Sequence, residues 1–260
     1  MKRAVALSMI LALLLIASAY TPRTQAFRIG VQVGDWFKYK GTIVYWWAEP
    51  DVPFPPHMYA FILQVYNETE WIKYEVIEIK AEARNVTFRV TNHWKNGTET
   101  YYNLTDNMDT SFTMMIIDAD LGPGDMVRPA YDWGFGYSWP PRYLNNTITV
   151  DYIGGSPRPV KVLDWVLPAF IPGSYTRQIY WWDNATGIQV RYEVRENSTA
   201  YDPNTFERLG DYRYIATFEL IDSNYNWGAV IPEYPKWPLA VLTLAATATI
   251  VCYGRKFRPK

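Results

Sequence analysis

Hydrophobic and polar residues alternate along most of this chain with a period of two. Residues 86–91 read Val-Thr-Phe-Arg-Val-Thr, and apolar residues occupy every second position from Tyr212 to Leu220. This period is typical of strands that turn one face toward a core. No stretch between residues 27 and 236 shows a sustained 3.6-residue period with helix caps. We therefore expect an all-β domain of mainly antiparallel strands, folded as a curved sheet, a half-barrel or a sandwich.

Several strands are expected in the N-terminal part. Gly30–Lys40 reads as a first strand, with Gly34-Asp35 as a turn between two short extended pieces. Four prolines between residues 50 and 56 indicate an exposed loop, because proline cannot donate a ladder hydrogen bond. Strand character resumes from Tyr59 to Tyr66.

Two local features predict specific strand geometry. Apolar residues at 72, 74 and 76 are followed by apolar residues at 77, 79 and 81, and this slip of one residue predicts a β-bulge near Val76-Ile77. Asn96-Gly97 is the dipeptide preferred in two-residue type I′ turns. It therefore predicts a hairpin before Thr98–Leu104.

The C-terminal part adds more strands. Ser111–Ile117 is expected to be a strand, and residues 146–153 and 160–166 are expected to form a hairpin. Another hairpin is expected to turn at Asp183–Gly187. A polar loop over Glu196–Gly210 then precedes the last strand.

One stretch has an aromatic residue at every odd position, and the five are Tyr131, Trp133, Phe135, Tyr137 and Trp139. In an extended conformation all five lie on one side, and Gly134 and Gly136 leave the other side bare. Such a ribbon suits a sugar-stacking platform or a lid over an apolar cavity. The alternative is a long loop that its rings fold onto the core.

Residues 1–26 have the composition of a secretion signal. The basic start Met1–Arg3 precedes an apolar run, and Ala17-Ser18-Ala19 supplies the small residues that a signal peptidase accepts. A second cleavage position follows Ala26, and an uncleaved signal would leave a second membrane helix. We expect cleavage.

The other end indicates a membrane anchor. A proline-rich linker, residues 230–237, leads into an apolar run, residues 238–253, which would span about 24 Å as a helix. The tail 254–260 has four cations and no acid, so the positive-inside rule places it in the cytoplasm. Residues 27–229 are then the extracellular domain of a single-pass protein in the cell membrane, held by contacts between the helix and lipid.

The charge of that domain differs from the charge of the chain. The whole chain has a net charge of −1, but its signal and tail hold seven of the 25 cations, so 18 cations face all 26 acids and the domain carries −8. A surface of that sign repels phosphate backbones, so we expect no nucleic-acid partner. The single cysteine, Cys252, lies in the apolar run, so the domain has no disulfide and depends on its core.

Acceptors for N-glycosylation are more frequent than composition explains. With 13 Asn and 29 Ser or Thr in 260 residues, about 1.5 Asn-x-Ser/Thr sequences are expected by chance. The chain contains seven, at Asn67, Asn85, Asn96, Asn103, Asn145, Asn184 and Asn197. Glycosylated positions must be exposed, so we expect them on turns or outward faces. The alternative is a β protein that simply uses Asn-Gly-Thr-like turns.

Three motifs occur near the start of the domain, late within it, and after it. They are Gly30-Val-x-x-Gly-Asp-Trp36, Tyr180-Trp-Trp-Asp-x-x-Thr-Gly187 and Ile231-Pro-Glu-Tyr-Pro235. Together they resemble a set of archaeal cell-surface proteins of unassigned function, which implies a location and no particular chemistry. The residues Pro232, Glu233, Tyr234 and Pro235 are similar to archaeal sorting signals, some of which a membrane transpeptidase-like enzyme processes. Such signals often have Phe where this chain has Tyr234.

The second motif also resembles the turn of lipoprotein-carrier half-barrels of the LolA type. In those proteins a curved antiparallel sheet wraps an apolar ligand cavity. The proline that usually follows the turn is absent, because Ile188 and Gln189 follow Gly187. The resemblance implies a half-barrel fold.

Few residues suit metal binding or nucleophilic catalysis. Only His57 and His93 occur, so we expect no histidine-rich zinc site and no Cys/His pair. Asp118, Asp120 and Asp125 lack the spacing of an EF-hand, so a solvated turn is favoured over a calcium site. No Walker loop or nucleophile elbow occurs, and we expect no cofactor.

The sequence thus predicts a class of protein and no specific reaction. The leading hypothesis is a membrane-anchored, N-glycosylated, non-enzymatic surface domain that binds a glycan, an envelope protein or another envelope component. One alternative is a carrier of lipid or another apolar ligand in a half-barrel cavity. The other is a hydrolase that pairs Asp132 with a second carboxylate.

Overall fold

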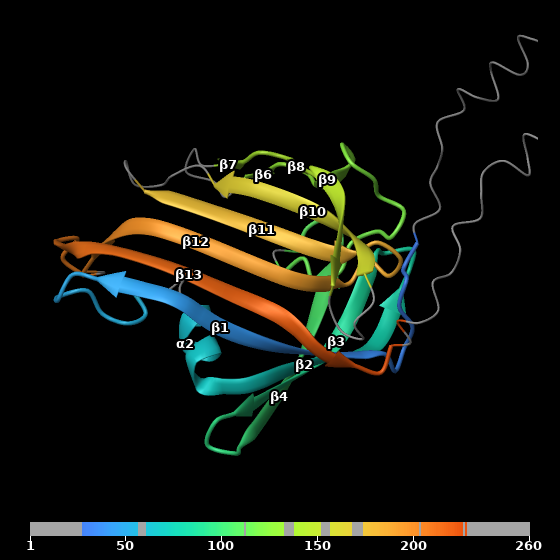
Figure 1. The fold of residues 1–260 in the computed structure, drawn as a ribbon, viewed down its shortest axis with the longest axis horizontal. Helices are drawn as coiled ribbons and strands as arrows, with labels where there is room; N and C mark the ends of the chain where they lie inside the picture. The colour runs from blue at the N-terminus through green and yellow to red at the C-terminus, as the bar shows by residue number, and fades with distance from the viewer. Residues whose placement is uncertain are drawn as a thin grey trace, which may run out of the picture. The chain divides into compact units, whose positions relative to one another are not determined.

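The computed structural model describes residues 28–56, 61–111, 113–132, 138–151, 157–167, 174–202, 204–225 and 227 (Figure 1). The expected signal peptide, linker, transmembrane helix, sorting motif and basic tail lie outside these residues. Within the described part, no helix is both long enough and apolar enough to cross a membrane.

In this part of the chain nine strands form one antiparallel sheet, in the order β4-β3-β2-β1-β13-β12-β11-β10-β9. Their bounds are β1 Trp36–Ala48, β2 Thr69–Lys80, β3 Asn85–Trp94, β4 Glu99–Asn107, β9 Asn146–Asp151, β10 Pro157–Leu167, β11 Tyr175–Asp183, β12 Gln189–Tyr201 and β13 Arg208–Ser223. The pairing of β1 with β13 joins two runs of sequential strands, and Figure 1 shows β1 in blue beside β13 in orange. The expected all-β class is confirmed for the described residues.

The two faces of this sheet differ in chemistry. The inner face carries buried apolar and aromatic residues such as Tyr39, Phe88 and Phe218, and all the expected inward positions of β13, from Tyr212 to Leu220, are buried. The outer face carries ion pairs, including Arg195 with Glu193 and Arg191 with Glu219. Alternation with a period of two therefore separates a core side from a charged side, as the sequence pattern predicts.

A short helix, α2 (Phe61–Glu68), packs against the inner face, so the expected strand Tyr59–Tyr66 is wrong. Leu63 and Tyr66 are buried and lie three residues apart, on one side of the helix, whereas Gln64 is exposed. The Tyr66 ring stacks on Phe218 with centroids 5.4 Å apart. A Cβ at Gly41 would lie 2.2 Å from the Tyr66 ring, so the helix docks where β1 has no side chain.

The expected strand Ser111–Ile117 is also wrong. Residues 114–119, here called the plug segment, form an irregular buried segment with one isolated bridge, between Ile116 and Ile188. Its backbone bonds to the β11–β12 connection: Ile117 N–H donates to the Gly187 carbonyl at 2.9 Å, and Gln189 N–H donates to the Met115 carbonyl at 2.8 Å. An apolar run buried on all sides resembles a buried strand in sequence, because both lack polar positions.

Other predictions of local structure are confirmed or corrected in detail. The bulge is confirmed by a register shift between Val76 and Glu78 where β2 pairs with β3. The hairpin at Asn96-Gly97 is confirmed, but its turn has three loop residues and only Gly97 has positive φ, so the type I′ turn is wrong. Strands β12 and β13 extend through most of the expected polar loop Glu196–Gly210, because their residues pair up to Tyr201 and Arg208.

The remaining hairpins agree with expectation in outline. Strand β9 pairs with β10, and β11 pairs with β12 across a turn in which Gly187 has a φ of 71°. The first strand begins only at Trp36, after the turn at Gly34, and continues to Ala48. Two small sheets complete the described fold, with β5 (Met126–Arg128) paired to β8 (Arg142–Tyr143) and β6 (Tyr131–Asp132) paired to β7 (Ser138–Trp139).

Candidate functional site

One end of the inner face carries a half-buried carboxylate held by two tyrosines, here called the Glu196 cluster. The hydroxyls of Tyr212 and Tyr214 donate to Glu196 Oε1 and Oε2 at 2.5 and 2.8 Å. The cross-strand register places Glu196 of β12 directly opposite Tyr214 of β13. Burial is the main cause that raises the pKa of both tyrosines, and the negative charge of Glu196 raises it further. Both hydroxyls therefore stay protonated and act as hydrogen-bond donors.

Aromatic rings extend this cluster toward solvent. Trp46 of β1 lies beside Tyr212 and Tyr214, with ring centroids 6.3 and 6.5 Å away. Phe54, from the proline-rich loop, packs edge-on against Trp46 at 5.0 Å and is 42% exposed. The result is an apolar surface with one fixed acceptor, which suits binding through ring stacking and hydrogen bonding.

The predicted aromatic ribbon is not a straight extended segment. Residues 131–132 pair antiparallel with residues 138–139, so the two described ends of the predicted ribbon run in opposite directions. Tyr131 is 39% exposed, whereas Trp139 is half-buried and packs edge-on against Trp165 with centroids 5.3 Å apart. Trp139 therefore contributes to the core, as the alternative interpretation of the ribbon states. Trp133, Phe135 and Tyr137 lie outside the described residues.

The seven predicted glycan acceptors all lie within the described part, and none is buried. Asn67, Asn96, Asn103 and Asn145 are exposed, and Asn85, Asn184 and Asn197 are half-exposed. The three that lie in strands are Asn85, Asn103 and Asn197, and each alternates with inward residues and so points to the outer face. The other four lie at the end of α2, in turns or in a connecting loop.

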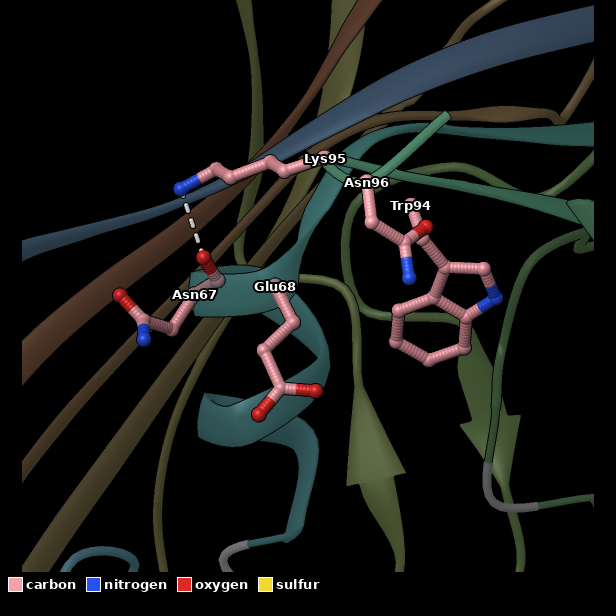
Figure 2. Close-up of a pocket in the computed structure, with 5 residues that line it drawn as sticks. All are labelled: Asn67, Glu68, Trp94, Lys95 and Asn96. Carbon is pink, nitrogen blue, oxygen red and sulfur yellow. Dashed lines mark hydrogen bonds between the residues drawn. The ribbon is translucent and has the colours of Figure 1, made fainter. Parts of the chain in front are cut away.

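Two of these acceptors share a pocket that sequence reasoning missed. A pocket of about 300 Å³ lies between the end of α2 and the β3–β4 turn, and Figure 2 shows its lining residues Asn67, Glu68, Trp94, Lys95 and Asn96. Lys95 joins the two elements, because its Nζ donates to the Asn67 carbonyl at 2.6 Å and its N–H donates to the Glu68 carbonyl at 2.8 Å. No sequence signal brings Asn67 to Asn96, since α2 itself was expected to be a strand.

Buried charges around the plug segment have structural partners. Asp106 accepts the Ile116 N–H at 3.2 Å, and Arg128 Nη2 lies 3.7 Å from its other oxygen. Lys161, which is 1% exposed, donates through Nζ to the Ala119 carbonyl at 2.5 Å. These groups satisfy backbone atoms of an irregular buried segment, which is what such a segment requires.

The residues considered for metal binding or catalysis are dispersed. Within the described residues, no group of three or more His, Cys, Asp or Glu is placed to hold a metal ion. His93 stacks on Trp71 with centroids 4.7 Å apart, while His57 lies outside the described part. Asp118 and Asp125 accept backbone N–H groups of Asp120 and Gly122. Asp132 belongs to β6, and only its backbone is described.

Fold and site together define an open antiparallel β domain with an aromatic inner face and a charged outer face. Comparison with protein-family models, curated proteins and solved structures finds no match for this chain.

Proposed function

We propose that this chain is a membrane-anchored, N-glycosylated cell-surface domain that binds a glycan or an envelope protein and catalyses no reaction. The main support for the proposal is the position of the predicted acceptors, which lie on accessible surfaces and, within strands, on the outer face of the sheet. None of the seven is buried, and the three in strands face outward. Attachment of a glycan requires an accessible Asn, and alternation along the strands leaves these three side chains on the outer face.

The ends of the chain supply the location. The signal peptide, residues 1–26, and the apolar run with its cationic tail, residues 238–260, support export followed by retention in the membrane. The linker 230–237 contains Pro232 and Pro235, which disfavour a helix and set the domain off from the membrane surface.

The surface we assign to the partner is the Glu196 cluster with Trp46 and Phe54. Exposed or half-exposed rings stack on the apolar faces of sugars and on protein side chains alike. The fixed carboxylate accepts hydrogen bonds from hydroxyl or amide groups of the partner. Glycan arrays and pull-downs from envelope fractions separate the two partner classes.

A carrier of an apolar ligand is the second candidate. It is favoured by the single open sheet, which would form a half-barrel around the aromatic inner face. Organic extraction of the purified protein followed by mass spectrometry tests it, because a carrier retains a bound lipid. A sample that yields no lipid contradicts the carrier function.

The anchored glycoprotein is tested in a glycosylating host. We expect the full chain in the membrane fraction with modified glycopeptides, and we expect deletion of residues 238–260 to release a soluble folded domain into the medium. A truncated protein that remains with the membrane after its signal is removed, or acceptors that all stay unmodified, would overturn the proposal. A mature protein that ends near residues 231–234 would support processing of the sorting motif.

A further inference from the structure

The β3–β4 turn has a backbone geometry that holds an aromatic ring next to a glycan acceptor. Gly97 N–H donates to the Trp94 carbonyl at 2.8 Å, and Trp94 N–H donates to the Thr98 carbonyl at 2.9 Å. Gly97 has a φ of 82°, so the turn is a three-residue loop closed by a left-handed glycine. This loop places Trp94 and Thr98 opposite each other, with Asn96 between them at the tip.

The acceptor side chain is fixed in one orientation. Asn96 Oδ1 accepts the backbone N–H of Thr98 at 2.9 Å and the hydroxyl of Thr98 at 2.7 Å. Both bonds use the oxygen of the amide, and Nδ2 is the atom to which a sugar is attached. Figure 2 shows Asn96 and the indole of Trp94 lining the same pocket.

The pocket is an open depression whose lining suits a sugar ring. Its volume of about 300 Å³ is at the lower end of the range for small-molecule sites. The indole supplies an apolar wall, and its Nε1 donates to Thr100 Oγ1 at 2.9 Å, which fixes the ring. Glu68 and the Asn67 side chain supply polar groups for sugar hydroxyls.

We propose that the first sugar ring of a glycan on Asn96 occupies this pocket and packs on Trp94. The sugar then contacts both the β3–β4 hairpin and α2 and stabilises their association. The inference rests on the proposed N-glycosylation and adds a structural role to one glycan. Attachment forms a bond between Nδ2 and C1 of the sugar as the bond from C1 to the phosphate leaving group of the donor breaks, and the amide releases one proton. The C–H face of the sugar then covers the indole.

Asn67 lines the same pocket but lacks the matching geometry. The hydroxyl of its acceptor partner, Thr69, donates to the Val65 carbonyl at 2.6 Å, and Thr69 is 2% exposed. The pocket is therefore assigned to the glycan of Asn96, and Asn103→Gln, at an exposed acceptor of β4 that does not line the pocket, serves as the matched control.

The test is a double-mutant cycle on the full glycosylated chain, in which glycopeptide mass spectrometry first measures occupancy of Asn96. Removing the glycan with Asn96→Gln is expected to lower Tm by about 2–4 °C, the shift typical of one modest interaction in a domain of this size. In a Trp94→Leu background, the same substitution is expected to lower Tm by clearly less, because the stacking surface is already gone and only the Asn96 bonds to Thr98 are still lost. Asn103→Gln is expected to leave the coupling between positions 94 and 96 unchanged.

The outcomes separate this inference from the proposed function. An occupied Asn96 whose removal lowers Tm equally in both backgrounds overturns the packing on Trp94 and leaves glycosylation intact. An unmodified Asn96 overturns the inference, and unmodified acceptors throughout would overturn the proposed function as well. If Trp94→Leu does not fold, Trp94→Phe replaces it, because this variant keeps a smaller ring. We expect Trp94→Phe to reduce the decrease in Tm that Asn96→Gln causes. A decrease of the same size as in the native background would contradict the stacking.

Discussion

At the scale of single residues, the tightest constraint lies in the turn between β11 and β12. Asp183 Oδ1 accepts the N–H groups of Ala185 and Thr186 and the hydroxyl of Thr186, at 2.8 to 3.0 Å. Gly187 follows with a φ of 71°, and its backbone lies against the plug segment. The sequence predicts this turn, because Asp, Asn and Gly are turn residues, but the contact with Ile117 depends on a segment seventy residues earlier.

Gly187→Ala is expected to destabilise the protein by at least about 2 kcal/mol, because the new Cβ adds backbone strain and overpacking. That Cβ would lie 2.1 Å from the Ile117 carbonyl oxygen. Gly124→Ala is the control: its φ is 87°, but a Cβ there meets nothing within 4 Å, so only the conformational cost remains. Urea unfolding measures both, and equal losses at the two positions would contradict the contact with the plug segment.

Lys161 makes stability depend on pH in a defined window. Burial lowers its pKa from 10.5 to about 8, although nearby Asp118 opposes this shift. Between these two values the unfolded chain binds more protons than the folded one, so the free energy of unfolding rises with pH. In Lys161→Met this rise is absent. We expect the stability of the native chain relative to the variant to increase from about pH 8 to about pH 10.5, measured by urea unfolding. Parallel pH profiles would contradict the assignment.

At the scale of elements, the strands follow the sequence pattern and the helix does not. The bulge near Val76 and the β9–β10 hairpin are visible in the sequence because a strand pattern is local and repeats every two residues. Helix α2 is only eight residues long, so its two buried positions cannot establish a 3.6-residue period. Its position is decided by the space that Gly41 leaves on β1.

Gly41→Val tests that docking. Its Cβ would overlap the Tyr66 ring at 2.2 Å, so we expect α2 to be displaced from the inner face. Overpacking of this kind typically costs about 1–3 kcal/mol. Limited proteolysis is expected to cut near residues 57–68 faster in the variant, and the companion change Tyr66→Ala is expected to restore part of the lost stability, since it removes the clashing ring. A variant whose α2 region resists proteolysis as the native chain does would show that the helix is held by other contacts.

At the scale of the whole molecule, the inner face unites buried tyrosines from both halves of the sheet and from α2. Burial is the largest cause that raises the pKa of each of them: Tyr39, Tyr66, Tyr74, Tyr180, Tyr212, Tyr214 and the partly buried Tyr192. Their hydroxyls remain protonated in the folded state above the ordinary pKa of 10.0. Above that pH the unfolded chain loses protons that the folded chain retains, so stability falls as pH rises.

We therefore expect cooperative alkaline unfolding. One pH unit above its ordinary pKa, each such tyrosine favours the unfolded state by about 1.4 kcal/mol, and several together approach the whole stability of a typical domain. Tyrosinate absorbance and far-ultraviolet circular dichroism should change together in one transition above about pH 10. Tyrosines that ionise near their ordinary pKa while the β-sheet signal persists would contradict the buried arrangement.

The sequence by itself determined most strands of the large sheet and which of their faces is inward, because these properties repeat over neighbouring residues. It also determined where the Asn-x-Ser/Thr sequences occur, and the outward placement of the three in strands follows from the same alternation. Only the tertiary structure decided that β1 pairs with β13, that Glu196 meets Tyr212 and Tyr214, and that Trp94 shares a pocket with Asn67. Such contacts depend on the order of strands in the sheet and on what covers its inner face. No local period records either property, because each is set by packing between segments distant in sequence.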